Sequence, residues 1–159
     1  MKLAVGSDER THLTDAVVEE IKKRGHAVEL FGPLNGESLL WPDVAQQVAE
    51  RVSQGQADQA ILFCWTGTGV SMAANKVPGI RAALVQDAET AKGARLWNRA
   101  NVLCMSLRAT SDVVAKEILD AWFNTPPGTD PIDAQCVEKV GAIEARYMGK
   151  QVQDRQGKT

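Results

Sequence analysis

The chain has 159 residues, which is the length of one domain that buries roughly 70% of the surface its unfolded chain exposes. Eighteen Lys and Arg residues against 20 Asp and Glu residues leave a formal charge of −2, which gives no electrostatic reason to expect nucleic acid or an anionic membrane as a partner. No apolar run approaches the roughly 18 residues that a membrane-spanning helix needs, and the first ten residues turn polar before a signal-peptide core can form. We therefore expect a cytoplasmic protein.

The cysteines predict neither a disulfide framework nor a zinc site. Cys64, Cys104 and Cys136 are odd in number, lie far apart and include no CxxC spacing. Reduced thiols are the better interpretation.

The first half of the chain predicts strands and helices in alternation. An apolar run at 2–7 predicts a strand, and apolar residues at helical spacing predict a helix over 14–24 that ends at a glycine. A second strand follows at 26–31 and is broken by Gly-Pro. Residues 42–53 continue as a helix with a proline in its first turn.

The second half begins with the strongest strand signal. Residues 57–65 hold a continuous apolar run, which is typical of a central parallel strand buried on both faces. The remaining elements are predicted, in chain order, as a short helix over 72–76, a strand at 79–86, a helix over 88–99, a strand at 101–106, a helix over 110–123, a break at 125–128 and a helix over 130–147.

This alternation predicts a single α/β domain over residues 1–149, followed by a polar C-terminal tail at 150–159. Five strands with interposed helices give a three-layer, doubly wound Rossmann-like fold with a five-stranded parallel sheet. Ligands of such sheets bind outside the carboxyl ends of the strands, where the strand order reverses. That rule directs attention to residues 6–10, 64–71, Asp87 and 106–110.

The loop at 64–71 (CWTGTGVS) carries the clearest chemical signal. Gly67 and Gly69 permit positive φ angles and close approach of the backbone, so successive N–H groups can converge on an anion beside a helix N-terminus. The thiol of Cys64 lies at the edge of this nest, where a thiolate acts as nucleophile or as base. The same residues also fit a core cysteine followed by a structural turn.

The loop does not match the known anion-binding motifs. It lacks the Gly-Lys pair of a Walker A loop, and Met72 stands where a dinucleotide fingerprint needs its third glycine. A phosphatase-type C-x5-R loop needs arginine where this chain has Val70, and a G-x-S-x-G elbow is absent. The remaining interpretation is an oxyanion nest with a thiol placed to move a proton.

The loop and its surroundings resemble a known family. The pattern Cys-x-Thr-Gly-x-Gly-x-Ser, followed by AANKVPGIRA at 73–82, is similar to the signature of ribose-5-phosphate isomerase B and its galactose-6-phosphate isomerase relatives. The similarity covers nearly the whole chain and includes Gly6-x-Asp8, the Pro42 segment, Arg95-x-x-Asn98-x-x-Asn101-Val102-Leu103, Arg108 and Val137-Glu138-x-x-x-Ala142-Ile143-Glu144.

The resemblance implies an aldose–ketose isomerase that acts on a small sugar phosphate through a cis-enediolate, without metal or cofactor. It also implies a homodimer or homotetramer in which the last helix packs on a neighbouring subunit.

Individual roles follow from the same resemblance. Cys64 matches the catalytic base that moves a proton between C1 and C2, and Thr66 matches a group that holds the enediolate oxygens. Asp8 and Asn98 match residues that grip sugar hydroxyls, and Arg108 matches a phosphate-binding arginine. The resemblance also implies that backbone amides help Thr66 to hold the enediolate oxygens. These amides belong to Gly67, Thr68, Gly69, Val70 and Ser71.

The chain departs from the family at five positions. Glu9 stands where the family has a histidine, and Trp97 stands where it has the histidine credited with opening the sugar ring. Ile132 and Cys136 replace the two arginines that the last helix lends to the neighbour's phosphate site, and Trp65 replaces a glycine. We still place Glu9 and Trp97 among the substrate-binding residues.

These departures bear on the substrate. Loss of the ring-opening histidine favours an open-chain substrate such as a tetrose or tetrulose phosphate, whereas the added carboxylate and the lost arginines favour a sugar without the terminal phosphate. Arg10, which we include in the substrate-binding set, and Arg99 are the candidates to supply positive charge. A phosphorylated substrate is the preferred interpretation.

Two other functions stay open at this point. A non-catalytic sugar- or nucleotide-binding module would keep the same fold, and an acyl- or phosphoryl-transfer enzyme would use Cys64 as a nucleophile. His12 is expected either in the pocket, as a replacement acid or base, or at the surface as a capping residue. Trp65 and Trp97 are expected either as an aromatic wall over the pocket or in the core.

Overall fold

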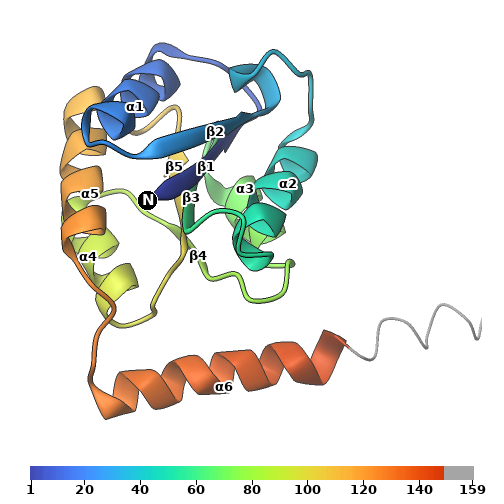
Figure 1. Ribbon diagram of the computed structural model, residues 1–159, viewed down its shortest axis with the longest axis vertical. Coiled ribbons are helices and arrows are strands. Elements are labelled where there is room, and N and C mark those ends of the chain that lie inside the picture. Colours follow the sequence, from blue (N-terminus) through green and yellow to red (C-terminus); the bar gives the residue numbers. More distant parts are fainter. Residues whose placement is uncertain (149–159) are drawn as a thin grey trace, which may run out of the picture.

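The computed structural model describes residues 1–148, so the predicted tail at 150–159 lies outside the described residues. Helices and strands alternate along the chain as the sequence predicts (Figure 1). In chain order they are β1 (Lys2–Ser7), α1 (His12–Lys23), β2 (Ala27–Phe31), the 3-10 turn η1 (Gly32–Leu34), α2 (Trp41–Ser53), β3 (Gln59–Cys64), α3 (Thr68–Ala74), β4 (Ala82–Leu84), α4 (Ala88–Leu96), β5 (Val102–Ser106), α5 (Asp112–Asn124) and α6 (Pro131–Met148).

The five strands form one parallel sheet in the order β2-β1-β3-β5-β4. The predicted α/β fold with a five-stranded parallel sheet is therefore confirmed. β2 lies on one side of β1 and β3 lies on the other, so the strand order reverses between β1 and β3. This reversal places the predicted ligand-binding point at the carboxyl ends of these two strands.

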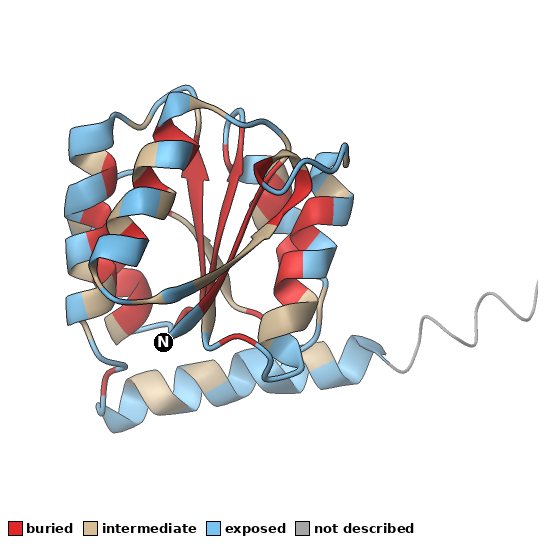
Figure 2. Ribbon diagram, turned by 45° about the horizontal axis from the view of Figure 1, so that its top comes forward, coloured by how far each residue is buried: buried red, intermediate tan, exposed pale blue. Residues whose placement is uncertain are grey.

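Helices cover both faces of the sheet and give three layers (Figure 2). α1, α4 and α5 bury one face, whereas α2 and α3 bury the other. Because successive side chains of a strand point to opposite faces, Phe63 lies in the first core and Cys64 in the second. Cys64 therefore faces the layer that contains α3.

The strand predicted at 79–86 is confirmed only over Ala82–Leu84. Two asparagine side chains hold the segment before it. Asn101 Nδ2 donates to the Gly79 carbonyl at 2.9 Å, and Asn75 Oδ1 accepts from the Ala82 amide at 2.8 Å. Side-chain hydrogen bonds thus satisfy backbone groups that a longer strand would pair in the sheet.

α6 lies beyond the amino ends of the strands, at the edge opposite to their carboxyl ends (Figure 2). None of its residues is buried. Glu144 joins it to the body of the protein, because both of its carboxylate oxygens accept from the Gly79 amide at 3.1 Å. Among residues 1–148 no helix combines the length and the apolarity that crossing a bilayer requires.

Candidate active site

The sheet brings three predicted segments to one level at its carboxyl edge. Ser7 is the register partner of Phe63, and Cys64 is the partner of Ser106. The residues that follow β1, β3 and β5 therefore lie side by side, with the Cys64 loop in the middle. These are the loops that the switch-point rule indicated.

Gly67 shapes the loop after β3. It adopts a left-handed conformation with φ of 75°, and its amide donates to the Cys64 carbonyl at 3.2 Å, which closes a tight turn. A side chain at this position would meet the Met105 backbone at 3.0 Å. α3 begins directly after this turn, at Thr68 instead of the predicted residue 72, because Gly67 serves as its N-cap.

The first turn of α3 leaves its amides available. Gly67 offers no side-chain cap to the amides of Thr68, Gly69 and Val70. The hydroxyls of Thr66 and Thr68 lie 2.6 Å apart and are hydrogen-bonded, and both residues are exposed. The side chain of Val70 is fully buried, so this residue can contribute to a ligand only through its amide.

Trp41 lies beside this loop, and the sequence did not predict that it would. It lies at the start of α2, and a methyl group on Gly69 would lie 3.1 Å from its ring. Trp41 remains 42% exposed, so it forms a partly solvated aromatic surface beside the loop. Trp65 is exposed on the loop itself.

Hydrogen bonds tie the loop after β5 to the Cys64 loop. The amides of Leu107 and Arg108 donate to the carbonyls of Cys64 and Trp65 at 3.0 and 3.1 Å. The Ser106 hydroxyl also donates to the Trp65 carbonyl, at 2.9 Å. The backbone of Arg108 is thereby fixed beside the Cys64 loop, and its side chain is exposed to solvent.

Asp8 supplies an unpaired polar atom at the switch point. Its Oδ1 is buried and has no hydrogen-bond partner among residues 1–148. Burial raises the pKa of Asp8 above its ordinary value, a hydrogen bond from its own backbone opposes the shift, and the charge of Glu9 adds to it. A buried acceptor without a partner is the kind of group that a ligand hydroxyl satisfies.

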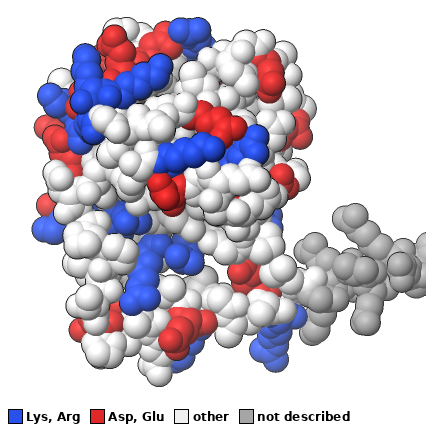
Figure 3. Space-filling model, in the orientation of Figure 1, with Lys and Arg blue, Asp and Glu red and all other residues white. Residues whose placement is uncertain are grey.

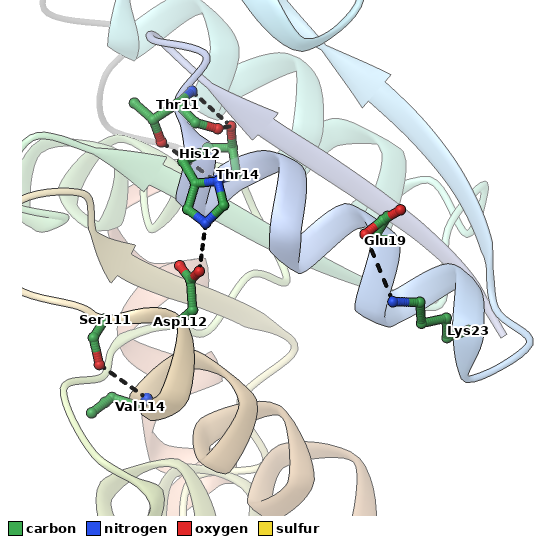
Figure 4. Close-up of polar contacts among 8 residues, drawn as sticks. All are labelled: Thr11, His12, Thr14, Glu19, Lys23, Ser111, Asp112 and Val114. Carbon is green, nitrogen blue, oxygen red and sulfur yellow. Dashed lines mark hydrogen bonds and ion pairs between the residues drawn. The ribbon is translucent and has the colours of Figure 1, made fainter.

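The next residues of this loop point elsewhere. Arg10 Nε donates to Asp15 Oδ1 at 2.9 Å, so its charge is paired on α1. His12 Nε2 lies 2.7 Å from Asp112 Oδ2 and joins the start of α1 to the start of α5 (Figure 4). The His12 side chain is 85% exposed, which favours the surface role over the pocket role.

Two further predicted positions have structural roles in this chain. Asp87 caps α4, because its Oδ1 accepts from the Thr90 amide at 2.7 Å, and this hydrogen bond lowers the pKa of Asp87. Cys104 is fully buried, and burial raises the pKa of its thiol, with the nearby Cys64 adding to the shift. Cys64, which ends β3 at the start of the loop, is itself buried and 6% exposed.

Comparison with known proteins gives the family. The model of the Ribose/Galactose Isomerase family matches residues 3–140. The chain belongs to this family.

Among residues 1–148 no group of three or more His, Cys, Asp or Glu side chains is placed to hold a metal ion.

Relatives of known name or structure cover most of the chain. Ribose-5-phosphate isomerase B of Escherichia coli is 37% identical over 91% of this chain and 97% of its own length. D-erythrulose-4-phosphate isomerase of Pectobacterium atrosepticum is 34% identical over 91% of this chain and 95% of its own length. The structure of ribose-5-phosphate isomerase B from Clostridium thermocellum superimposes with a TM-score of 0.86 at 39% identity, and covers 92% of this chain and 99% of that one.

Two predicted site residues of this Ribose/Galactose Isomerase family member do not join the Cys64 loop. Trp97 and Asn98 follow α4, whose carboxyl end lies at the amino edge of the sheet, and both line a cavity with Cys136 of α6. Within one chain Trp65 and Trp97 therefore lie apart and form no common wall. The alternative that they pack in the core is wrong, because both are more than half exposed. A βα crossover separates the two tryptophans by the length of the sheet, which sequence proximity to a motif does not reveal.

Proposed function

We propose that the chain is an aldose–ketose isomerase for a small sugar phosphate, with Cys64 as the base and the loop at 66–71 as the oxyanion nest. The observation that carries the proposal is the arrangement at the switch point. Cys64 ends β3 just before the uncapped amides at the start of α3, and the neighbouring strand β1 leads to Asp8, whose Oδ1 is unpaired. Membership of the Ribose/Galactose Isomerase family supports the reaction class.

The proposed chemistry assigns the proton transfer to Cys64 and the stabilisation of negative charge to the amides. The Cys64 thiolate removes the C2 proton of the aldose, and the electron pair moves into the carbonyl so that negative charge develops on O1. Amide donors preorganised at that oxygen supply about 3–4 kcal/mol each to the transition state. The proton of the C2 hydroxyl then passes to O1, the thiol gives its proton to C1, and the C2 carbonyl of the ketose forms. A base positioned in this way contributes roughly 10²–10⁴ in rate.

Asp8 and Arg108 orient the substrate in this proposal. The unpaired Oδ1 of Asp8 accepts a hydrogen bond from a sugar hydroxyl, and the exposed guanidinium of Arg108 pairs with the phosphate. The relatives named for ribose 5-phosphate and D-erythrulose 4-phosphate support a phosphorylated substrate of four or five carbons. Glu9 lies at the same edge and is exposed, where it repels a phosphate and thereby favours its placement toward Arg108.

A second copy of the chain completes the site in this proposal. Asn98 and Trp97 lie at the far edge from the Cys64 loop of their own chain, so they reach such a loop only from a neighbour. α6 supports this arrangement, because Ile132, Val140 and Ile143 are all more than half exposed. At about 100° per residue these three side chains fall within about 80° of the helix circumference, which makes a stripe that a partner can cover.

The direct test is a substrate screen. Tetrose, pentose and hexose sugars, each with and without a terminal phosphate, are incubated with the purified chain, and the aldose and ketose are separated and quantified. We expect turnover of a phosphorylated tetrose or pentose. Turnover restricted to free sugars would contradict the proposal that Arg108 binds a phosphate. Absence of turnover with every sugar would contradict the proposal that the chain is an aldose–ketose isomerase.

A further inference from the structure

The turn that follows α4 carries two residues of the proposed substrate-binding set. Trp97 and Asn98 are exposed on this turn, and the chain returns to the core at Ala100, which is 1% exposed. Between them Arg99 has a φ of 49°, the single positive value of a non-glycine residue among residues 1–148. A left-handed conformation is unfavourable for a residue with a Cβ atom, and it persists only where surrounding groups hold it. The groups that hold this turn therefore decide where its exposed side chains lie.

Arginine side chains hold two carbonyls of the turn. Arg81 Nε donates to the Arg99 carbonyl at 3.0 Å, and Arg95 Nη1 donates to the Ala100 carbonyl. The amide of Ala100 donates to the Ala94 carbonyl at 2.9 Å. Because Arg95 lies in the last turn of α4, its side chain joins the helix to the far end of the turn and encloses the residues between these two points.

The guanidinium group of Arg95 is buried against an aromatic ring. Arg95 is 8% exposed, and its guanidinium carbon lies 5.3 Å from the centre of the Trp122 ring. None of the ion pairs among residues 1–148 includes Arg95. Burial lowers the pKa of Arg95, and the charge of Arg81 adds to the shift. A cation that is removed from water without a counter-charge destabilises a fold.

Arg95 stands behind the surface that a ligand meets. Two cavities border the turn, and Trp97 and Asn98 belong to the described lining of both, whereas Arg95 belongs to the described lining of neither. Lys and Arg side chains reach the surface in the hollow between α6 and the body of the protein (Figure 3), but the charge of Arg95 is buried. Any effect of Arg95 on a ligand therefore passes through the position of the turn.

We propose that Arg95 is a positioning residue, which holds the turn after α4 in the conformation that presents Asn98 to a substrate. An apolar side chain of similar length would pack against Trp122 without the cost of a buried charge, so packing does not account for an arginine here. What the guanidinium group adds is the donor to the Ala100 carbonyl. The contact of Asn98 with a substrate rests on the proposed function, whereas the hold on the turn does not.

Three variants separate this role from a general effect on stability. Arg95→Met removes the donor but keeps an unbranched, apolar stem against Trp122. Arg95→Lys is the conservative variant, because it keeps a cationic donor on a flexible stem. Ile118→Val is the matched control, since Ile118 is buried on α5 in the same core as Trp122, and the substitution removes one methylene group without changing the turn.

Amide hydrogen exchange, followed by NMR on the full chain, tests the hold on the turn. The amides of Ala100 and Asn101 donate to backbone carbonyls and report opening of the turn, and the amides of β5 report opening of the sheet. Relative to β5, we expect the two turn amides to exchange at least about tenfold faster in Arg95→Met than in the wild type, the factor that corresponds to the loss of one hydrogen bond to a charged group. Arg95→Lys and Ile118→Val should stay within about threefold of the wild type.

Two results of the exchange measurement would overturn the proposal. One is an unchanged ratio of turn to β5 exchange in Arg95→Met, and the other is an equal rise of that ratio in Ile118→Val. Thermal unfolding verifies that each variant is folded. If Arg95→Met does not fold, Arg95→Gln takes its place with the same expected result, because it also lacks the charged donor.

Steady-state kinetics with the sugar phosphate that the chain converts fastest test whether Arg95 acts through Asn98. Arg95→Met and Asn98→Ala should each lower kcat/KM, and the double variant should lose no more than about twofold beyond Asn98→Ala alone. A loss equal to the product of the two single losses would show that Arg95 acts independently of Asn98 and would overturn the positioning role. Failure of the chain to isomerise any sugar would remove the proposed function but not the hold on the turn, because the exchange measurement requires no turnover.

Discussion

At the scale of single residues, Gly67 decides the geometry of the Cys64 loop. Its positive φ turns the chain back toward β3, and its lack of a side chain lets the turn lie against β5. Gly25 has a similar φ of 79°, but a methyl group there would meet nothing within 4 Å. The two glycines therefore separate the cost of backbone conformation from the cost of crowding.

We predict that Gly67→Ala lowers the free energy of unfolding more than Gly25→Ala does. Both variants pay roughly 1–2 kcal/mol for the left-handed conformation, and Gly67→Ala pays a further ~1–3 kcal/mol for overpacking against the Leu84 side chain and the Met105 backbone. Urea unfolding of the two variants measures the difference. Equal losses would show that the loop relaxes without cost.

Asp8 predicts a dependence of stability on pH. Its pKa in the folded chain is raised above the ordinary value of 3.8, so the folded state binds the proton more tightly than the unfolded state. The stability that this residue contributes is complete below pH ~3.8 and is lost as the pH rises through the folded pKa. Asp8→Asn should therefore gain stability relative to the wild type as the pH increases over that interval. Urea unfolding at a series of pH values measures the gain, and a difference that does not vary with pH would contradict the assignment.

At the scale of helices and strands, the His12–Asp112 contact joins the starts of α1 and α5. These helices follow the loops that carry Asp8 and Arg108, so the contact links two sides of the candidate site. Both side chains are exposed, and exposed pairs of this kind contribute little to stability.

A double-mutant cycle of His12→Ala and Asp112→Ala should give a coupling free energy below about 1 kcal/mol. Turnover in His12→Ala should stay within about threefold of the wild type, because a lost general acid or base would instead cost roughly 10²-fold or more. A loss of that larger size would place His12 in the chemistry.

Much of the element order could be predicted from the sequence, and the exceptions have physical causes. The buried run that contains Cys64 identified the central strand because parallel strands are apolar on both faces. The early start of α3 was missed, since it depends on the left-handed turn at Gly67. The contact of Trp41 with Gly69 joins two separate helices, and no local pattern reports it. The separation of Trp97 from Cys64 depends on the direction in which α4 crosses the sheet.

At the scale of the whole molecule, the exposed stripe on α6 predicts association between copies. Ile143→Glu places a charge on that stripe and should shift the chain toward the monomer in size-exclusion chromatography with light scattering. Activity should fall with it if Asn98 acts across the interface. Val113→Glu, on the exposed side of α5, is the matched control and should leave the assembly unchanged. A fully active monomeric wild type would contradict the shared site.

The central claim is that the Cys64 thiol carries the proton between C1 and C2. The most direct measurement is incorporation of deuterium from deuterated water into C1 and C2 of the preferred sugar phosphate, followed by NMR for the wild type, Cys64→Ala and Cys104→Ala. We predict incorporation by the wild type and by Cys104→Ala, and a loss of at least about 10²-fold in a folded Cys64→Ala variant. Exchange by Cys64→Ala at nearly the wild-type rate would contradict the account.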